Sequence, residues 1–427
     1  MPRSSTAPAE LACQRHTLDN GLRLVLHPDR GLPLVTVDVW YHVGSKNERP
    51  GRTGFAHLFE HMLFQGSENV GTNDHFRYIQ QAGGVANGST WYDRTNYYET
   101  LPGHYLELGL WLESDRLGFL LPAMTQEKLD NQREVVINER RQRVDNQPYG
   151  RAMERVHELL YPGHPYHWPV IGYMEDIAAA TLDDVQEFFH TYYTPNNAVL
   201  TLAGDFEPDA ARELVERWFG GLPRGPQVPA VEAELVPLGG ERREVLGDDV
   251  LLPRVYMAHR APRFGDEVWY AADVLATALS SGKASLLYEE LVYRRQIAQD
   301  VISYVYPTEI AATFLTVATA RPGVDPAEVE AALGEVLARC ADEPLPEERL
   351  ERARARVLQD FWIAMEKLDG RADLLSQYTT YFDDPERVVG EPERYRRIRA
   401  EAVRDYARRW CVADERVVVT VVPREAP

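Results

Sequence analysis

Two segments near the N-terminus have the hydrophobic pattern of strands in a half-buried sheet. Val35, Val37, Val39 and Tyr41 alternate with other residues, the period of two that a strand with one buried face shows. Residues 21–26 follow an Asp-Asn-Gly turn signal and predict a further strand. Longer stretches with helical spacing follow, so this half of the chain mixes strands with helices; the expected helices cover 54–64, 74–82, 105–120 and 126–145.

One helix–turn–strand unit occurs twice. Residues 183–205 and 401–423 align without a gap, and each predicts an amphipathic helix, a short turn and a β-branched strand. Such units often resemble one another by chance, but a separation of about half the chain favours a duplicated domain. Residues 220–240 contain four prolines and five glycines, a density that predicts a linker. We therefore expect an α+β protein of two homologous domains, each with an antiparallel or mixed sheet packed against helices. The N-terminal domain would cover residues 12–220, the linker 221–240 and the C-terminal domain 241–427.

Composition and charge narrow the classes of function. The 427 residues are 44% hydrophobic and 26% charged, which is ordinary for globular proteins. Acidic residues outnumber basic ones by 66 to 46, and a net charge of −20 argues against nucleic acid or an anionic membrane as partner. Three scattered cysteines exclude a disulfide framework. Residues 1–16 lack the apolar core of a signal peptide, and no long apolar run predicts a membrane span, so we expect a cytoplasmic location.

The segment that carries the most specific chemistry is Gly54–Gly66, GFAHLFEHMLFQG. On a helix, His57 and His61 lie one turn apart, and Glu60 lies beside them on the same face. Two imidazoles at this spacing can bind one Zn²⁺, and the adjacent glutamate can take a proton from an attacking water molecule. The apolar neighbours imply a buried helix, where three titratable side chains are costly unless a metal or other partners compensate. The pattern therefore favours a metal site over isolated core histidines.

H-x-x-E-H is the inverted zincin motif, and the surrounding sequence resembles the pitrilysin/insulinase family of metallopeptidases, especially its mitochondrial-processing-peptidase-like branch. The resemblance covers most of residues 15–220 and is carried, in order, by FAHLFEHMLFQGS, GGVANGSTWYDRTNYYETLP, REVVINERRQRVDNQP and YPGHPYHWPVIG. It implies paired homologous α+β domains, in agreement with the internal repeat. It also implies a zinc metalloendopeptidase that binds one Zn²⁺ per chain and cleaves peptides or unfolded protein segments.

The resemblance assigns roles to matching positions. His57 and His61 would be zinc ligands, Glu60 the general base, and Glu139, on a downstream helix, the third ligand. Without the resemblance, Glu139 could equally be a solvated charge on a highly charged helix. The family usually has a second glutamate seven residues before the metal-binding one, where this chain has Gln132. A glutamine keeps the hydrogen bonding near the metal but loses the charge, so we expect weaker metal affinity or a lower rate.

A substrate-binding strand is implied beside the zinc. Asn87, Gly88 and Ser89 match the family's edge strand, to which a peptide adds through main-chain hydrogen bonds. The alternative interpretation is an ordinary edge strand with turn residues. His164 and His167 form a second H-x-x-H pair, but the prolines around them forbid a regular helix, and we expect a structural role for both.

The C-terminal half has no H-x-x-E-H motif, so we expect it to be catalytically silent. Residues 279–304 resemble a region in which the family supplies an arginine and a tyrosine to the substrate; Val292 and Gln299 occupy those positions here. Ser281-Gly282-Lys283 is too short for a phosphate-binding loop and predicts a turn at a helix start. A chain with the zinc residues but without this clamp implies a heterodimer with a homologous subunit that provides the arginine and tyrosine.

Two alternatives to this function stay open. The chain could be a self-sufficient homodimeric peptidase that replaces the missing clamp with other residues. It could also be an inactive, metal-bearing scaffold or assembly subunit. The presence of Glu60 argues against a scaffold, which has no need of a general base.

Overall fold

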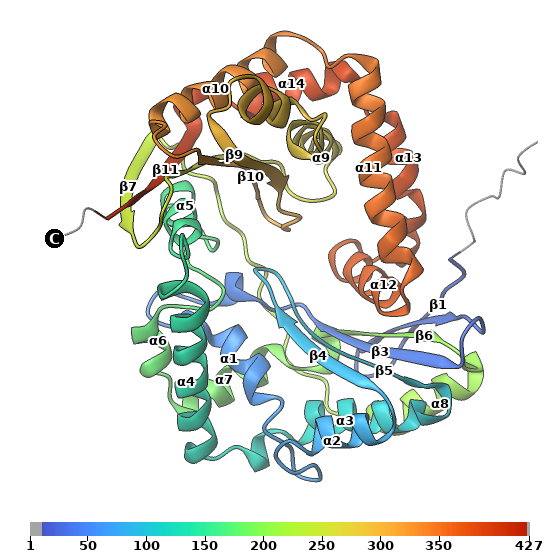
Figure 1. Cartoon of the computed structure of the whole chain (residues 1–427). Coiled ribbons are helices and arrows are strands. Elements are labelled where there is room, and N and C mark those ends of the chain that lie inside the picture. The colour runs from blue at the N-terminus through green and yellow to red at the C-terminus, as the bar shows by residue number, and fades with distance from the viewer. Residues whose placement is uncertain (1–10, 425–427) are drawn as a thin grey trace, which may run out of the picture. The chain divides into compact units, whose positions relative to one another are not determined.

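The computed structural model describes residues 11–424, which form two compact units (Figure 1). Unit 1 contains residues 11–137, 170–231 and 363–391; unit 2 contains 138–169, 232–362 and 392–424. Each unit therefore includes a segment from the other half of the sequence. Residues 1–10, which enter the signal-peptide interpretation, and 425–427, the end of the range predicted for the C-terminal domain, lie outside the described residues.

Unit 1 is built on a six-stranded mixed sheet with the strand order β1-β2-β6-β3-β5-β4. Only β2 and β6 pair in parallel, and all other neighbours are antiparallel. Among residues 11–424, the edge strand β4 pairs with β5 alone. The strands are β1 (Gln14–Thr17), β2 (Arg23–Pro28), β3 (Leu34–Tyr41), β4 (Val85–Thr90), β5 (Thr95–Pro102) and β6 (Ala198–Gly204).

Helices cover both faces of this sheet. In Figure 1, α2, α3 and α8 lie on one face and α12 on the other, and α12 packs against β3 and β6. The predicted helices at 54–64, 74–82, 105–120 and 126–145 are confirmed by α1 to α4, the last of which continues as a π-helical turn over Arg141–Asp145. The helices are α1 (Phe55–Met62), α2 (Asp74–Gln81), α3 (Leu106–Phe119), α4 (Gln126–Arg140), α6 (Met174–Ala178), α7 (Leu182–Tyr192), α8 (Pro208–Phe219) and α12 (Leu368–Phe382).

Unit 2 has a five-stranded mixed sheet with the order β7-β11-β8-β10-β9, in which only β7 and β11 are parallel. Helix α5 packs against β8 and β11, and α14 packs against α9 and α10. The strands are β7 (Arg242–Asp248), β8 (Arg254–Ala261), β9 (Ala298–Val305), β10 (Ala312–Ala320) and β11 (Arg416–Pro423). The helices are α5 (Ala152–Leu160), α9 (Glu267–Ser280), the π-helical turn η6 (Tyr288–Arg294), α10 (Pro326–Asp342), α11 (Glu347–Glu366), α13 (Glu391–Arg397) and α14 (Ala400–Trp410).

The repeated unit of the sequence occupies equivalent places in the two sheets. Helix α7 leads into β6, and α14 leads into β11. Each of these strands has one parallel and one antiparallel neighbour. The α+β class with two homologous sheet-and-helix domains is thus confirmed. Residues 223–239 between the two sheets form neither helix nor strand, and no helix within residues 11–424 is long and apolar enough to cross a membrane.

The expectation that β3 is half buried is wrong. Seven of its eight residues are buried. The reason is that α12 covers the second face of the strand, which carries the polar residues of the alternating pattern. Asp38 on that face accepts hydrogen bonds from Ser376 Oγ at 2.6 Å and Asn96 Nδ2 at 3.2 Å. Asp373 on α12 accepts one from Trp40 Nε1 at 3.1 Å. These polar residues of β3 therefore bind the helix that covers them.

Asp38 and Asp373 form a buried carboxyl pair whose charge depends on pH. Burial, together with the neighbouring Asp373, raises the pKa of Asp38 well above its ordinary value. Burial also raises the pKa of Asp373, although the Arg94 guanidinium opposes this shift. A carboxyl group whose pKa is higher in the folded than in the unfolded state contributes its full stabilisation at pH values below its unfolded-state pKa. That stability is lost as the pH rises towards the folded-state pKa.

We expect Asp38→Asn to reduce this loss of stability. Because the asparagine does not titrate, the free energy of unfolding of the variant relative to the wild type should rise by about 1 kcal/mol or more between pH 5 and pH 8. Urea unfolding at the two pH values measures this difference. Asp209→Asn is the matched control, because Asp209 is an exposed aspartate of α8, which lies on the opposite face of the sheet from α12. A difference for Asp38→Asn that is constant with pH would contradict the buried-pair assignment.

Candidate metal centre

Helix α1 carries three of the candidate residues, and its start is fixed by a buried carboxyl group. The backbone N–H groups of Gly54 and Ala56 each donate to Glu48 at 2.8 Å. A carboxyl group at this place satisfies N–H groups of the first turn, and these hydrogen bonds oppose the burial that raises the pKa of Glu48 well above its ordinary value. Gly54 itself has φ +81°, and a Cβ there would lie 2.6 Å from the carbonyl oxygen of Ile171. The chain can therefore enter α1 in one way, which sets the direction of its side chains.

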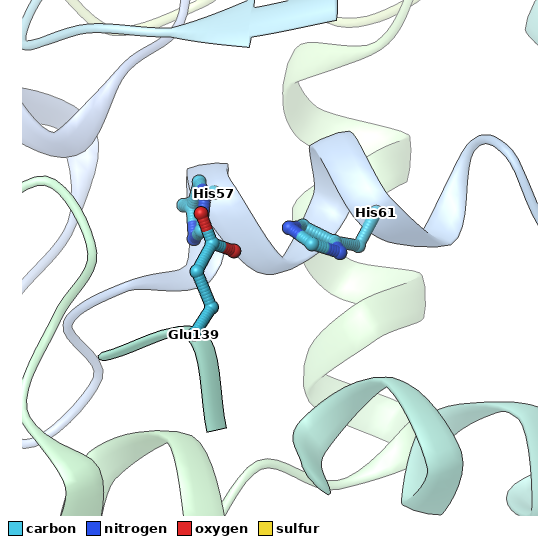
Figure 2. Close-up of side chains that lie close together, drawn as sticks. All are labelled: His57, His61 and Glu139. Carbon is cyan, nitrogen blue, oxygen red and sulfur yellow. The ribbon is translucent and has the colours of Figure 1, made fainter. Parts of the chain in front are cut away.

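His57, His61 and Glu139 converge (Figure 2). The two histidines lie one turn apart on α1, with ring centroids 4.9 Å apart. Glu139 comes from the last turn of α4, and its carboxylate points towards the two imidazoles. One donor atom from each residue lies within 4.8 Å of the other two. All three side chains are partly exposed, so an ion and a substrate can reach them.

This donor set fits zinc. Two imidazole nitrogens and one carboxylate oxygen are the ligands of many hydrolytic zinc sites, and three protein donors leave one tetrahedral position open. Glu139 also forms an ion pair with Arg143 at 2.8 Å, but the Arg143 side chain is 76% exposed. Exposed pairs of this kind contribute little free energy, so a metal ion can replace Arg143 as the partner of Glu139.

Glu60, the candidate general base, is held by a residue of the edge strand. Thr90 Oγ1 donates a hydrogen bond to Glu60 Oε2 at 2.7 Å. Thr90 is the last residue of β4, and the alternation along this strand places it on the same face as Gly88. The sequence does not identify Thr90, because its role arises from a contact with α1 that no sequence period encodes.

The predicted substrate strand is β4, at the edge of the sheet. Strand alternation places the side chains of Asn87 and Ser89 on the opposite face from Thr90. Ser89 Oγ donates to Asn96 Oδ1 at 2.7 Å, and Asn87 Oδ1 accepts from the backbone N–H of Gly88 at 2.9 Å. A Cβ at Gly88 would lie 3.1 Å from the Tyr97 ring and 3.2 Å from the Phe64 ring, so glycine lets β4 lie close to these two aromatic side chains. The strand therefore presents its main chain at the edge, and substrate binding by Asn87, Gly88 and Ser89 stays a prediction.

Gln132 lies on α4, two helical turns before Glu139 and on the same face. It is buried, and its Nε2 donates to Asn131 Oδ1 at 2.9 Å. Glu134 is exposed and points in another direction. The helix thus places a neutral amide where the family usually has a charge, and the effect of Gln132 on metal affinity stays a prediction.

His164 and His167 belong to neither of the two groups of potential metal ligands found among residues 11–424. His164 is buried, and its Nδ1 accepts a hydrogen bond from the backbone N–H of Tyr166 at 3.1 Å. Burial lowers the pKa of His164 to about 4, so its ring is neutral. These contacts agree with a structural role.

The second group consists of His75, Glu99 and Glu113, all buried. Arg116, also buried, forms an ion pair with Glu113. Burial and the adjacent Glu113 raise the pKa of Glu99 well above its ordinary value, and burial lowers that of His75. All three side chains are buried, and Glu113 already pairs with Arg116. A hydrolytic metal needs an open position that water and substrate can reach, so this group fits such a site less well than the partly exposed His57, His61 and Glu139 do.

Both halves of the chain match peptidase family models. Residues 23–172 match the model described as insulinase, peptidase family M16. Residues 179–357 match the model of the peptidase M16 inactive domain. The candidate metal ligands therefore lie within the residues that match the insulinase model, and most of the C-terminal half matches the inactive-domain model.

Curated relatives and solved structures agree with these matches. The zinc protease PqqE of Helicobacter pylori is 30% identical over 371 residues, which cover 86% of this chain and 83% of the relative. A probable mitochondrial-processing peptidase subunit beta of Arabidopsis thaliana is 26% identical over 267 residues, or 62% of this chain and 50% of the relative. The crystal structure of a protease from Helicobacter pylori superimposes with a TM-score of 0.92 at 28% identity and covers 96% of this chain and 99% of that one.

We expect Glu139→Gln to weaken zinc binding. Changing a residue that only supports a metal ligand lowers affinity by about 10–100-fold, so loss of a ligand should cost at least about a hundredfold. Competition with a chromophoric chelator measures the affinity. Glu134→Gln is the matched control, since it removes the same charge from an exposed position of α4. Equal affinities for the two variants would exclude Glu139 as a ligand.

Proposed function

The chain belongs to the insulinase family of peptidases, M16, and from this membership we propose that it is a zinc-dependent endopeptidase. It would hydrolyse peptides or unfolded protein segments together with a homologous partner subunit. The observation that carries the proposal is the convergence of His57, His61 and Glu139 beside Glu60. These four residues supply three metal ligands and a base within one half-buried site.

Glu60 has the central chemical role in this proposal. Zinc, when bound by His57, His61 and Glu139, supplies a Lewis acid that acidifies water and polarises a peptide carbonyl. Glu60 accepts the proton of the attacking water and then returns it to the nitrogen of the leaving amine. The hydrogen bond from Thr90 Oγ1 holds one carboxylate oxygen of Glu60 and so orients the base.

The edge of β4 supports an endopeptidase rather than a hydrolase of small molecules. An unpaired strand edge binds extended chains through main-chain hydrogen bonds, largely independently of sequence. Thr90 ends this strand and contacts Glu60, so a peptide added along β4 would lie next to the base. This placement suits a main-chain carbonyl as the reacting group.

The proposed partner rests on what the C-terminal half lacks. Val292, at the position of the family's arginine, is buried in η6, and Gln299 is the second residue of β9. The nearby Arg294 pairs with Glu289 and Glu290, and Arg295 pairs with Glu290 and Glu335. Neither of the two family positions carries the arginine or the tyrosine, which supports a clamp supplied by a homologous subunit. The relative named as subunit beta of a processing peptidase fits this arrangement.

The two alternatives make different predictions. A self-sufficient homodimer would turn over peptides as the purified, zinc-loaded chain alone, whereas the heterodimer requires a homologue with the arginine and tyrosine. An inactive scaffold would bind zinc and assemble but cleave nothing, even with that homologue. A cytoplasmic location remains part of the proposal.

We expect Glu60→Gln to abolish peptide cleavage while zinc binding and assembly stay intact. Removing a general base typically costs about 10²–10⁴-fold in rate. Cleavage of a quenched fluorescent peptide library by the active assembly measures the loss, and metal analysis confirms one zinc per chain. Glu68→Gln, at an exposed position beyond α1, should retain activity. Cleavage by Glu60→Gln at the wild-type rate would refute the proposed mechanism.

We expect Thr90→Val to lower kcat by about tenfold, because the loss of one charge-assisted hydrogen bond is worth about 1.5 kcal/mol or more. The valine is close in shape, so KM and thermal stability should change little. Thr90→Ser restores the hydroxyl and should recover most of the rate. Steady-state kinetics of both variants separate kcat from KM. If serine does not recover the rate, the hydroxyl does not orient Glu60.

A further inference from the structure

Unit 2 contains a cavity of about 290 Å³ between α11 and the turn that follows α9. Its wall includes Arg349, Arg352 and Arg356 on one side and Ser281, Gly282 and Ser285 on the other. No carboxylate is among the described residues that line it. In a chain of net charge −20, three guanidinium groups around one cavity are an unusual concentration of positive charge.

The arginines share one face of α11, since they are three and four residues apart along the helix. Arg349 donates to the carbonyl oxygen of Ala284 at 3.0 Å and also pairs with Glu289. Within residues 11–424, the ion pairs of Arg352 and Arg356 run along their own helix, with Glu348 and Asp360, and these carboxylates are 83% and 57% exposed. Such exposed pairs contribute little free energy, so a ligand can compete for both guanidinium groups.

Ser285 gives an independent indication of a ligand. It lines the cavity and is only 4% exposed. Its Oγ has no hydrogen-bond partner among the described residues. A buried hydroxyl without a partner is costly, and native structures usually satisfy it. A ligand oxygen in the cavity would provide the missing acceptor.

We propose that this cavity binds the phosphate group of a small phosphorylated molecule. Arginine guanidinium groups bind phosphate in bidentate geometry, and serine hydroxyls donate to phosphate oxygens. A phosphate group carries a charge of about −1.5 to −2 at pH 7, more than the −1 of a carboxylate, and so matches several guanidinium groups better. Ser281-Gly282-Lys283 forms a turn, as predicted, and is too short to be a phosphate-binding loop by itself. The positive charge of the site comes from the arginines of α11. The proposal does not depend on the peptidase function.

The test is a phosphorus NMR titration of the full chain with inorganic phosphate, at constant ionic strength maintained with chloride. Wild-type protein should bind phosphate, and Arg352→Gln and Arg356→Gln should each weaken binding about tenfold. Arg397→Gln, which removes an exposed arginine of α13, is the matched control and should bind like the wild type. The absence of binding at millimolar phosphate would overturn the proposal. Equal binding by all four proteins would also overturn it, and this is the result expected if phosphate binds at the metal centre instead.

Ser285→Ala separates a binding role from a structural one. Because the Ser285 Oγ makes no hydrogen bond within the described part of the chain, its removal should leave the thermal midpoint of the free protein unchanged or raise it, while phosphate affinity falls several-fold. A lowered midpoint with unchanged affinity would contradict the role given to Ser285. Malonate is the carboxylate control: tighter binding of malonate than of phosphate at the same arginines would assign the cavity to carboxylates and refute the phosphate proposal.

Discussion

The carboxyl group of Glu48 holds the first turn of α1, and the candidate site depends on this interaction. It accepts hydrogen bonds from the N–H groups of Gly54 and Ala56, directly before His57. A helix of eight residues is too short to be stable alone, so its position must come from such contacts and from the burial of its apolar face. With the start of α1 fixed, the helical spacing alone places His57, Glu60 and His61 together.

Two other elements complete the site from different parts of the chain. Helix α4 brings Glu139 to the two histidines, and strand β4 brings Thr90 to Glu60. The strand that orients the base is also the free edge of the sheet. In the proposed function, substrate binding and proton transfer are therefore coupled through a single residue. On the other face of the same sheet, α12 packs over Asp38, so both faces are covered.

Features set by neighbouring residues could be predicted from the sequence, whereas features set by contacts between distant segments could not. The helical spacing of His57, Glu60 and His61 is a short-range pattern, and the structure presents these residues as that pattern implies. Glu139 could be chosen among many charges of α4 only through the family resemblance. Glu48 and Thr90 were missed, because their roles arise from contacts that no sequence period encodes. Likewise, the polar alternation of β3 suggested solvent, whereas the covering helix lies more than 300 residues later in the chain.

The most direct test of the central claim is anomalous diffraction at the zinc absorption edge from crystals of the zinc-loaded protein. The account predicts one peak per chain, about 2.0–2.2 Å from a nitrogen of His57, a nitrogen of His61 and a carboxylate oxygen of Glu139. Arg143 should then no longer pair with Glu139. A peak among His75, Glu99 and Glu113, or no peak at His57 and His61 in protein that cleaves peptides, would contradict the account.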